Sequence, residues 1–218
     1  MNKFKISLTK IRKYLREVSV VVIGVAVTLF ASYWIGVENE KRNMILHLNA
    51  IKVEQEENIK ILESAIEHLE PSVKYTLYLW SHDKNSLNKD SIHSYFSVAN
   101  NFESFTFKTN AFEMFKNSGV MRLMKNKELL LAIWDVYAEL LHLKQTGDEY
   151  NNRKWSLIEK DIPLIEINKG EVKYDIIPMY SFYAIGAPIA ILLEYEQALE
   201  KSKTIVMKLK KMYPCSLK

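Results

Sequence analysis

The sequence predicts an all-α protein, in which an N-terminal transmembrane helix continues into an antiparallel helical bundle or coiled-coil-like domain. Three observations predict this fold. The 20 residues 18–37 carry no charge, apolar residues recur at three- and four-residue intervals elsewhere, and the 218 residues include only 6 Gly and 5 Pro. We expect three parts: a basic amphipathic cytoplasmic arm over 1–17, the transmembrane helix over 18–37, and an extracytoplasmic helical domain over 38–218.

The uncharged stretch has the length of a membrane span. At about 1.5 Å per residue, a helix of this length crosses the roughly 30 Å hydrocarbon core of a bilayer. Inside lipid the backbone must satisfy its own hydrogen bonds, which a helix does. Lys and Arg concentrate before the stretch, and such an excess marks the cytoplasmic side. We therefore expect a cytoplasmic N-terminus in a bacterial inner membrane, with the residues after Glu38 in the periplasm.

The arm before the span combines positive charge with an apolar stripe. Its basic residues are Lys3, Lys5, Lys10, Arg12, Lys13 and Arg16. The stripe consists of Phe4, Leu8, Ile11, Leu15 and Val18. Spacings of four and three predict a helix that lies on anionic lipid at the membrane surface. The alternative is a basic tail without fixed structure.

A cleaved signal peptide is the main alternative to a retained anchor. Cleavage after Ala31 would place bulky Leu29 where a small residue is needed, and the apolar run continues through Tyr33 and Trp34. These residues favour an anchor that stays in the mature chain.

One face of the span carries small residues. Gly24, Thr28, Ser32 and Gly36 recur every four residues. Small residues at this spacing let a second helix backbone approach closely, so we expect this face to pack against another span. The alternative is that they reflect only the general abundance of small residues in membrane helices.

The first half of the exported domain is predicted to form one long helix followed by irregular structure. The apolar stripe over 39–70 consists of Ile45, Leu48, Ile51, Gln55, Ile59, Leu62, Ile66 and Leu69, with Glu54, Glu56, Glu57, Glu63 and Glu67 on the other faces. Pro71 predicts a kink or the start of a new helix over 72–80. We expect a polar loop over 81–91, a short helix over 92–99, and an extended segment over 101–109 that places Phe102, Phe105 and Phe107 in the core.

The second half predicts three more helices. Asn110 and Glu113 form a capping box, and Ser118-Gly119 form a stop. A long helix should run from Lys127 to Ile158 despite Gly147. Its expected buried side is Leu130, Ile133, Trp134, Tyr137, Leu140, Leu141 and Lys144. A loop or small hairpin follows over 161–175. The last helix should run from Pro188 to Lys211, with a buried stripe of Ile189, Leu192, Leu199, Val206 and Leu209.

Residues 176–193 leave a second topology open. This stretch carries no charge and is 18 residues long, so a second span would return the C-terminus to the cytoplasm. Pro178, Pro188 and the acids Glu194 and Glu196 instead favour a buried helix with an irregular lead-in.

Several segments resemble a large family of uncharacterised bacterial proteins with one N-terminal span and a helical exported domain. The similar segments are Glu17 to Gly24, the polar exit Glu38 to Asn43, the Glu-rich helix over 53–63, Asn110 to Gly119, and Leu123 to Leu130. The similarity covers roughly residues 12–145. The family usually has Gln and Asn where this chain has Phe30, Ala31 and Ser32. The resemblance implies a membrane-anchored helical protein and carries no activity or catalytic residue.

The charge balance does not indicate nucleic-acid binding. The net charge of +4 comes from the arm, because the remainder of the chain has 24 basic and 25 acidic residues.

Glu139 and His142 have the spacing of a di-metal bundle ligand pair, with Asp135 one turn earlier, but only one such Glu-x-x-His pair occurs. The sequence has no phosphate loop, nucleophile elbow or zinc-protease motif. We therefore expect no metal site, no cofactor and no enzyme activity.

These features predict a non-enzymatic, single-pass membrane protein that works by binding. Its expected partners are the lipid bilayer and a second copy or another membrane protein of an envelope assembly. A ligand-sensing module is the alternative. Because only about 17 residues precede the span, too few for an output domain, such a module would signal through a partner. A metal-dependent enzyme is a third hypothesis.

Overall fold

The structure, a computed structural model, describes residues 8–82, 86, 104–161, 166–168, 171–173, 182–183 and 185–213. Its elements are α1 (Leu8–Ser81), α3 (Asn110–Asn117), the 3-10 turn η2 (Val120–Leu123), α4 (Lys127–Asp161), β1 (Glu166–Asn168), β2 (Glu171–Lys173) and α6 (Ala187–Met212). The all-α prediction is confirmed. The two short strands form an antiparallel hairpin in which Ile167 faces Val172, at the place where a loop or small hairpin was expected.

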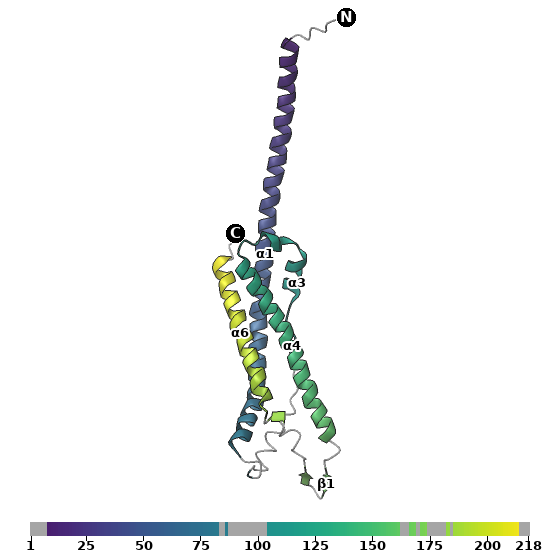
Figure 1. Ribbon diagram of the computed structural model, residues 1–218, viewed down its shortest axis with the longest axis vertical. Helices are drawn as coiled ribbons and strands as arrows, with labels where there is room; N and C mark the ends of the chain where they lie inside the picture. Colours follow the sequence, from purple (N-terminus) through teal and green to yellow (C-terminus); the bar gives the residue numbers. More distant parts are fainter. Residues whose placement is uncertain are drawn as a thin grey trace.

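Helix α1 is the 74-residue axis of the molecule. Its first half projects away from the rest of the protein, and its second half lies in the bundle (Figure 1). Side chains of α1 first become buried at Met44, seven residues after the end of the uncharged stretch. Among the helices in the described parts of the chain, α1 is the one that is long and apolar enough to cross a membrane.

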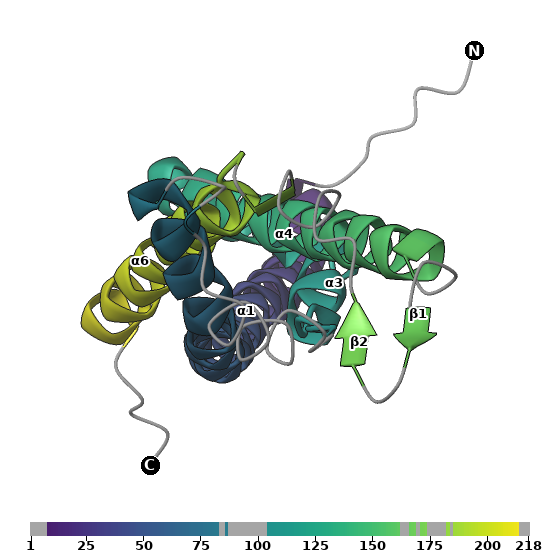
Figure 2. The same ribbon diagram turned by 90° about the horizontal axis from the view of Figure 1, so that it is seen from below.

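Pro71 lies inside α1 and does not start a new helix. Figure 2, which looks at the molecule from below, shows the last turns of α1 leading away from the axis of the preceding turns. Proline lacks an N–H and its ring crowds the preceding turn, so a change of direction without a break is the expected result. The last turns of α1 thus change direction, and the helix continues through Pro71 to Ser81 instead of starting again there.

The bundle is built on α1. Helix α6 runs antiparallel to α1, as the ion pairs Lys203–Glu63 and Lys210–Glu56 show. Helix α4 packs against α6, and α3 with η2 packs against α1. The core between these elements includes Leu48, Ile51, Leu62, Phe115, Met124, Ile133, Leu140, Tyr183, Ile205 and Leu209.

Glycine permits two close contacts in this bundle. A Cβ at Gly147 of α4 would lie 2.9 Å from the Tyr195 hydroxyl of α6. A Cβ at Gly186 would lie 2.9 Å from the Trp80 ring, and Gly186 also has a φ of +79°. The chain therefore turns into α6 directly against the end of α1.

The buried face of α4 differs from the predicted one. Ile133, Tyr137 and Leu140 are buried as expected, but Leu141 is 67% exposed and Lys144 is exposed. Trp134 is 38% exposed and Leu130 is half-buried. The residues buried instead are Leu129, Val136, Leu143, Tyr150 and Lys154. The cause is the position of α6, which covers the Val136 and Leu143 side, whereas Trp134 faces α3.

The stripes of α6 and α1 also shift. Val206 and Leu209 are buried, whereas Ile189, Leu192 and Leu199 are half-buried, and Tyr195, Ala198 and Ser202 lie in the core. On α1, Leu48, Ile51, Gln55 and Leu62 are buried as predicted, and Ile45, Ile59, Ile66 and Leu69 are half-buried. Glu54, assigned to an outer face, is 6% exposed.

The segment 176–193 does not form one helix. Ile185 and Gly186 make a turn, and α6 begins at Ala187 with Pro188 in its first turn. Pro188 and Ile191 are buried in the bundle, which agrees with a buried helix, whereas residues 176–181 and 184 of the predicted lead-in lie outside the described residues. The predicted helix 92–99 and the position of Phe102 lie outside the described residues. Of the neighbouring aromatics, Phe107 is buried and Phe105 is half-buried.

Candidate functional site

The first candidate site is the bare segment, which we define as residues 11–37 of α1. Its side chains are exposed along the whole length, with Val37 half-buried. A methyl group at Gly24 or Gly36 would meet no atom within 4 Å. The Thr28 hydroxyl donates to the Gly24 carbonyl oxygen at 2.9 Å, and the Ser19 hydroxyl donates to Leu15 at 2.7 Å. Because both hydroxyls are satisfied within the helix, the uncharged part of the segment, residues 18–37, presents a largely apolar surface.

The predicted packing face lies on this segment. Gly24, Thr28, Ser32 and Gly36 are all exposed, and no described residue of the bundle covers them. The structure thus leaves the small-residue face open for contact with lipid or another helix.

The described part of the basic arm, residues 8–17, forms the beginning of the same helix. Arg12, Lys13 and Arg16 are exposed on α1, Lys10 lies in its first turn, and Lys3 and Lys5 lie outside the described residues. Residues 8–17 are collinear with the span (Figure 1). This arrangement places the cations at one end of the bare segment.

The second candidate site is the buried carboxylate of Glu54. One of its oxygens accepts the Tyr137 hydroxyl at 2.5 Å, and its two oxygens accept the amides of Ala111 and Phe112 at 2.7 and 3.3 Å. A negative charge at a helix N-terminus is favoured by the free N–H groups and the dipole. The predicted capping box of Asn110 and Glu113 is wrong: α3 has Thr109 at its N-cap without a side-chain cap, and Glu54 from α1 takes over this role.

A second contact pairs the chain before α3 with α1. Asn58 donates to the Lys108 carbonyl oxygen at 2.9 Å and accepts from the Lys108 amide at 2.7 Å. Lys108 also pairs with Glu57 at 2.8 Å between side chains that are about half exposed. Together Glu54 and Asn58 hold the segment 108–112 on α1.

Aromatic rings complete this cluster. Phe112 stacks on Tyr137 with ring centroids 4.3 Å apart, and Trp134 meets Phe112 edge-on at 5.0 Å. Burial, and then the bond to Glu54, raise the pKa of the Tyr137 hydroxyl. The Glu54 oxygens accept from three donors, so this arrangement joins α1, α3 and α4.

Sequence reasoning missed Glu54, although a signal was present. Glu54, Gln55 and Asn58 fall between Ile51 and Leu62 at core spacing, where polar residues are costly unless they are hydrogen-bonded. Such a polar insert in an apolar stripe indicates a buried network.

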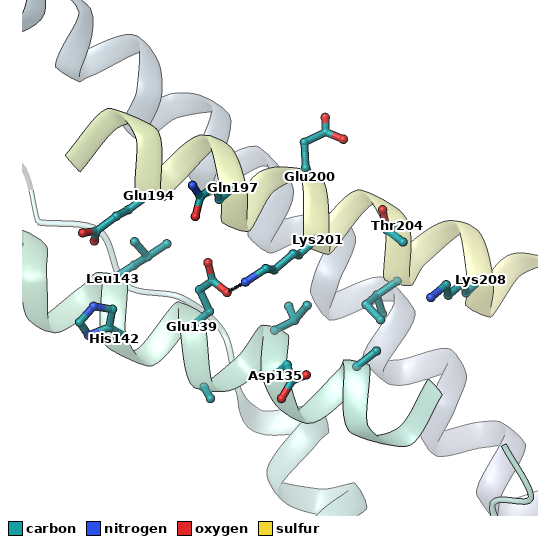
Figure 3. Close-up of a pocket in the computed structure, with 14 residues that line it drawn as sticks. Asp135, Glu139, His142, Leu143, Glu194, Gln197, Glu200, Lys201, Thr204 and Lys208 are labelled. Atoms are coloured by element: carbon teal, nitrogen blue, oxygen red, sulfur yellow. Dashed lines mark hydrogen bonds and ion pairs between the residues drawn. The ribbon is translucent and has the colours of Figure 1, made fainter. Parts of the chain in front are cut away.

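The third candidate site is a groove of about 860 Å³ between α4 and α6. It contains the residues considered as metal ligands, Asp135, Glu139 and His142, all on α4 (Figure 3). Lys201 of α6 crosses the groove and pairs with Glu139. Within the described residues, no three His, Cys, Asp or Glu side chains are placed to hold a metal ion. The groove is open, carries both charge signs, and is suited to reversible contact with a polar ligand or peptide.

A small cavity of about 40 Å³ lies between α1, α4 and α6. Lys154, which is 2% exposed, lines it together with Tyr150 and Tyr195. The Lys154 ammonium lies 5.6 Å from the centre of the Tyr150 ring. Burial lowers the pKa of Lys154 to about 8 and raises the pKa of Tyr195 to about 12. Its size limits the cavity to water or a very small ion.

No protein-family model matches this chain, and neither the curated proteins nor the solved structures contain a match.

Proposed function

We propose that this protein is a non-enzymatic, single-pass membrane protein whose helical domain binds a partner in a membrane or envelope assembly. The observation that carries the proposal is the bare segment, which is exposed along its length, is uncharged over residues 18–37 and is continuous with the bundle through one helix. Exposed apolar patches larger than a few hundred Å² mark interaction or membrane surfaces. A helix of this length and composition is best covered by lipid.

The distribution of charged residues around the span supports the proposed orientation of the chain. Exposed Arg12, Lys13 and Arg16 precede the span, and Glu38, Glu40, Lys41 and Arg42 follow it in near balance. The positive-inside rule then favours a cytoplasmic N-terminus and a periplasmic bundle in a bacterial inner membrane.

The partner surface within the membrane is the small-residue face. Gly24, Thr28, Ser32 and Gly36 offer close backbone approach to a second copy of α1 or to another span. Since the same helix forms the axis of the bundle, contact between spans also sets the position of the periplasmic domains relative to one another.

Three measurements on the full chain in native membranes test this proposal. The protein should stay in the membrane pellet after carbonate extraction, reporters fused at residues 85 and 218 should both act outside the cytoplasm, and cross-linking should capture a second membrane protein or copy. Release by carbonate overturns the anchor, a cytoplasmic reporter at 218 overturns the topology, and a protein that is always monomeric and without a partner overturns the binding role.

A sensing role is the second candidate, and the α4–α6 groove favours it. Helix α6 packs along α1, so a ligand that wedges between α4 and α6 would act on the membrane helix through α6. Screening the detergent-solubilised chain for ligands that raise its melting temperature tests this role, with Lys201→Ala as the variant that should lose the effect. A ligand whose effect survives that substitution binds elsewhere.

A further inference from the structure

We propose that the end of the bundle nearest the bare segment docks on anionic lipid headgroups of the membrane that α1 crosses. The contact is made by the basic collar: Lys41, Arg42, Arg122, Lys125, Lys127 and Lys211. This inference rests on the proposed function, because it requires α1 to span a bilayer. The surface is distinct from residues 8–17 of the N-terminal arm, which lie at the opposite end of the bare segment (Figure 1).

Contacts between separate elements assemble the collar. The Arg122 guanidinium of η2 pairs with Glu40 of α1 at 2.9 Å, so η2 lies beside the point where α1 leaves the bare segment. Asn126, just before α4, contacts the Met212 sulfur at 3.7 Å, which brings the end of α6 to the same place. The start of α4 and the end of α6 lie together at this end of the bundle (Figure 1).

The collar lies at the height of the lipid headgroups. Val37 ends the uncharged stretch and Met44 is the first buried residue of α1, a separation of seven residues or roughly 10 Å along a helix. The headgroup layer on each side of the hydrocarbon core is about 5–8 Å thick. Lys and Arg side chains at the end of the bundle therefore extend into or against this layer, in the manner of interfacial basic residues.

Charge is unevenly distributed along the exported domain. The collar has six basic residues, and the acids at the same end are Glu38, Glu40 and Glu128, so this end has a formal charge of +3. The remaining exported residues have 18 basic and 22 acidic side chains, a formal charge of −4. Arg42, Lys125, Lys127 and Lys211 are exposed. The positive charge is thus concentrated at the end next to the bare segment, whereas the rest of the exported sequence has an excess of acids, and this asymmetry favours anionic lipid at the collar.

The test uses the full chain in nanodiscs, with a donor dye on Asn117→Cys in a Cys215→Ser background and an acceptor on the lipid headgroups. Asn117 is exposed at the end of α3, close to η2. We expect higher energy transfer in discs rich in phosphatidylglycerol than in phosphatidylcholine discs. The difference should vanish at about 1 M salt, where the Debye length is about 3 Å.

Two variants that lose the same number of positive charges distinguish a contact made by the collar from a general effect of net charge. Replacing Arg122, Lys125, Lys127 and Lys211 by Gln should lower the docked-to-undocked ratio more than tenfold, because each basic residue near an anionic surface contributes about fivefold. Replacing Lys60, Lys74, Lys144 and Arg153 by Gln should leave it unchanged. These four residues are also exposed, and Lys74, like Arg122, has an ion-pair partner.

The outcomes distinguish this inference from the proposed function. Energy transfer that is independent of lipid charge, in a protein that inserts into the discs, overturns the collar and leaves the anchor intact. An equal fall of the docked-to-undocked ratio in both variants also overturns the collar. A protein that does not insert overturns the proposed function itself.

Discussion

The Tyr137 hydroxyl donates a 2.5 Å hydrogen bond to the Glu54 carboxylate, at the point where α3 begins. The same carboxylate accepts the amides of Ala111 and Phe112, so one side chain of α1 joins α3 and α4 to the helix that carries the bare segment. Any movement of α1 relative to α3 or α4 must break these hydrogen bonds. The Glu54 carboxylate therefore couples α3 and α4 to α1, beside the contact that α6 makes along α1.

Replacing Glu54 by Ala should destabilise the bundle by about 3 kcal/mol, because three donors in a buried site lose their acceptor. Glu54→Gln should lower the free energy of unfolding by less, since the amide oxygen of Gln still accepts hydrogen bonds. The measurement is urea unfolding of the solubilised chain, followed by tryptophan fluorescence, which includes Trp134 beside Phe112.

Glu57→Ala provides the matched control. Glu57 is one turn away and pairs with Lys108 at the surface, where an ion pair contributes at most about 1 kcal/mol. A loss for Glu54→Ala no larger than that for Glu57→Ala would show that the cluster does not hold the bundle together.

Gly186→Ala should destabilise the bundle more than Gly119→Ala. Both glycines have positive φ, +79° and +70°, so each substitution brings a backbone penalty of roughly 1–2 kcal/mol. Only at Gly186 does the added Cβ also meet a neighbour, the Trp80 ring at 2.9 Å. Comparison of the two unfolding midpoints tests the packing of α1 against the start of α6, and equal midpoints would contradict it.

Stability should rise between about pH 8 and pH 10 because of Lys154. Its pKa is about 8 in the folded protein and 10.5 in its ordinary state, so in this interval the unfolded chain binds more protons and rising pH favours folding. The gain is on the order of 2–3 kcal/mol. Above about pH 10 the direction reverses, because burial raises the pKa of Tyr137, Tyr183 and Tyr195, and the unfolded chain loses their protons first.

Unfolding midpoints from pH 7 to 10 measure this effect, and Lys154→Met should flatten the rise. Lys144→Met is the control, because Lys144 lies on the same helix and is exposed. A rise that persists in Lys154→Met would assign it to another group.

Gly24→Ile should weaken association of the spans and leave the bundle unchanged. A side chain at Gly24 meets no atom of the protein within 4 Å, so folding has no reason to respond, whereas a bulky residue prevents close approach of a second helix. Ala26→Ile places the same bulk on a different face of the span. Cross-linking yield in native membranes should fall for Gly24→Ile only; equal yields for both variants would contradict a role for this face.

Several features could be predicted because they depend on neighbours in sequence. The uncharged stretch 18–37, the Ser118-Gly119 stop and the long helix from Lys127 all follow from local periodicity and backbone preference, and the structure contains the corresponding helix segment, turn and helix. The hairpin around residue 170 followed from Asn168-Lys169-Gly170, a sequence typical of turns.

The arrangement of the buried faces could not be predicted in this way. Trp134 and Leu141 have the spacing of a core stripe, but α6 packs on the other side of α4 and leaves Leu141 at the surface. Pro71 predicts a local disturbance, whereas the outcome, one helix that continues through it, depends on the packing around it. Glu54 looks like a solvent-facing acid until α3 places its free amides against it.

The amino-acid sequence alone determined the helical class, the position and length of the apolar segment, and most helix bounds, because these depend on interactions within a few residues along the chain. Tertiary structure decided which side of each helix is buried, that Glu54 rather than Glu113 caps α3, and that cations from α1, η2, α4 and α6 gather at one end. These depend on groups far apart in sequence, whose meeting is set by how the helices pack.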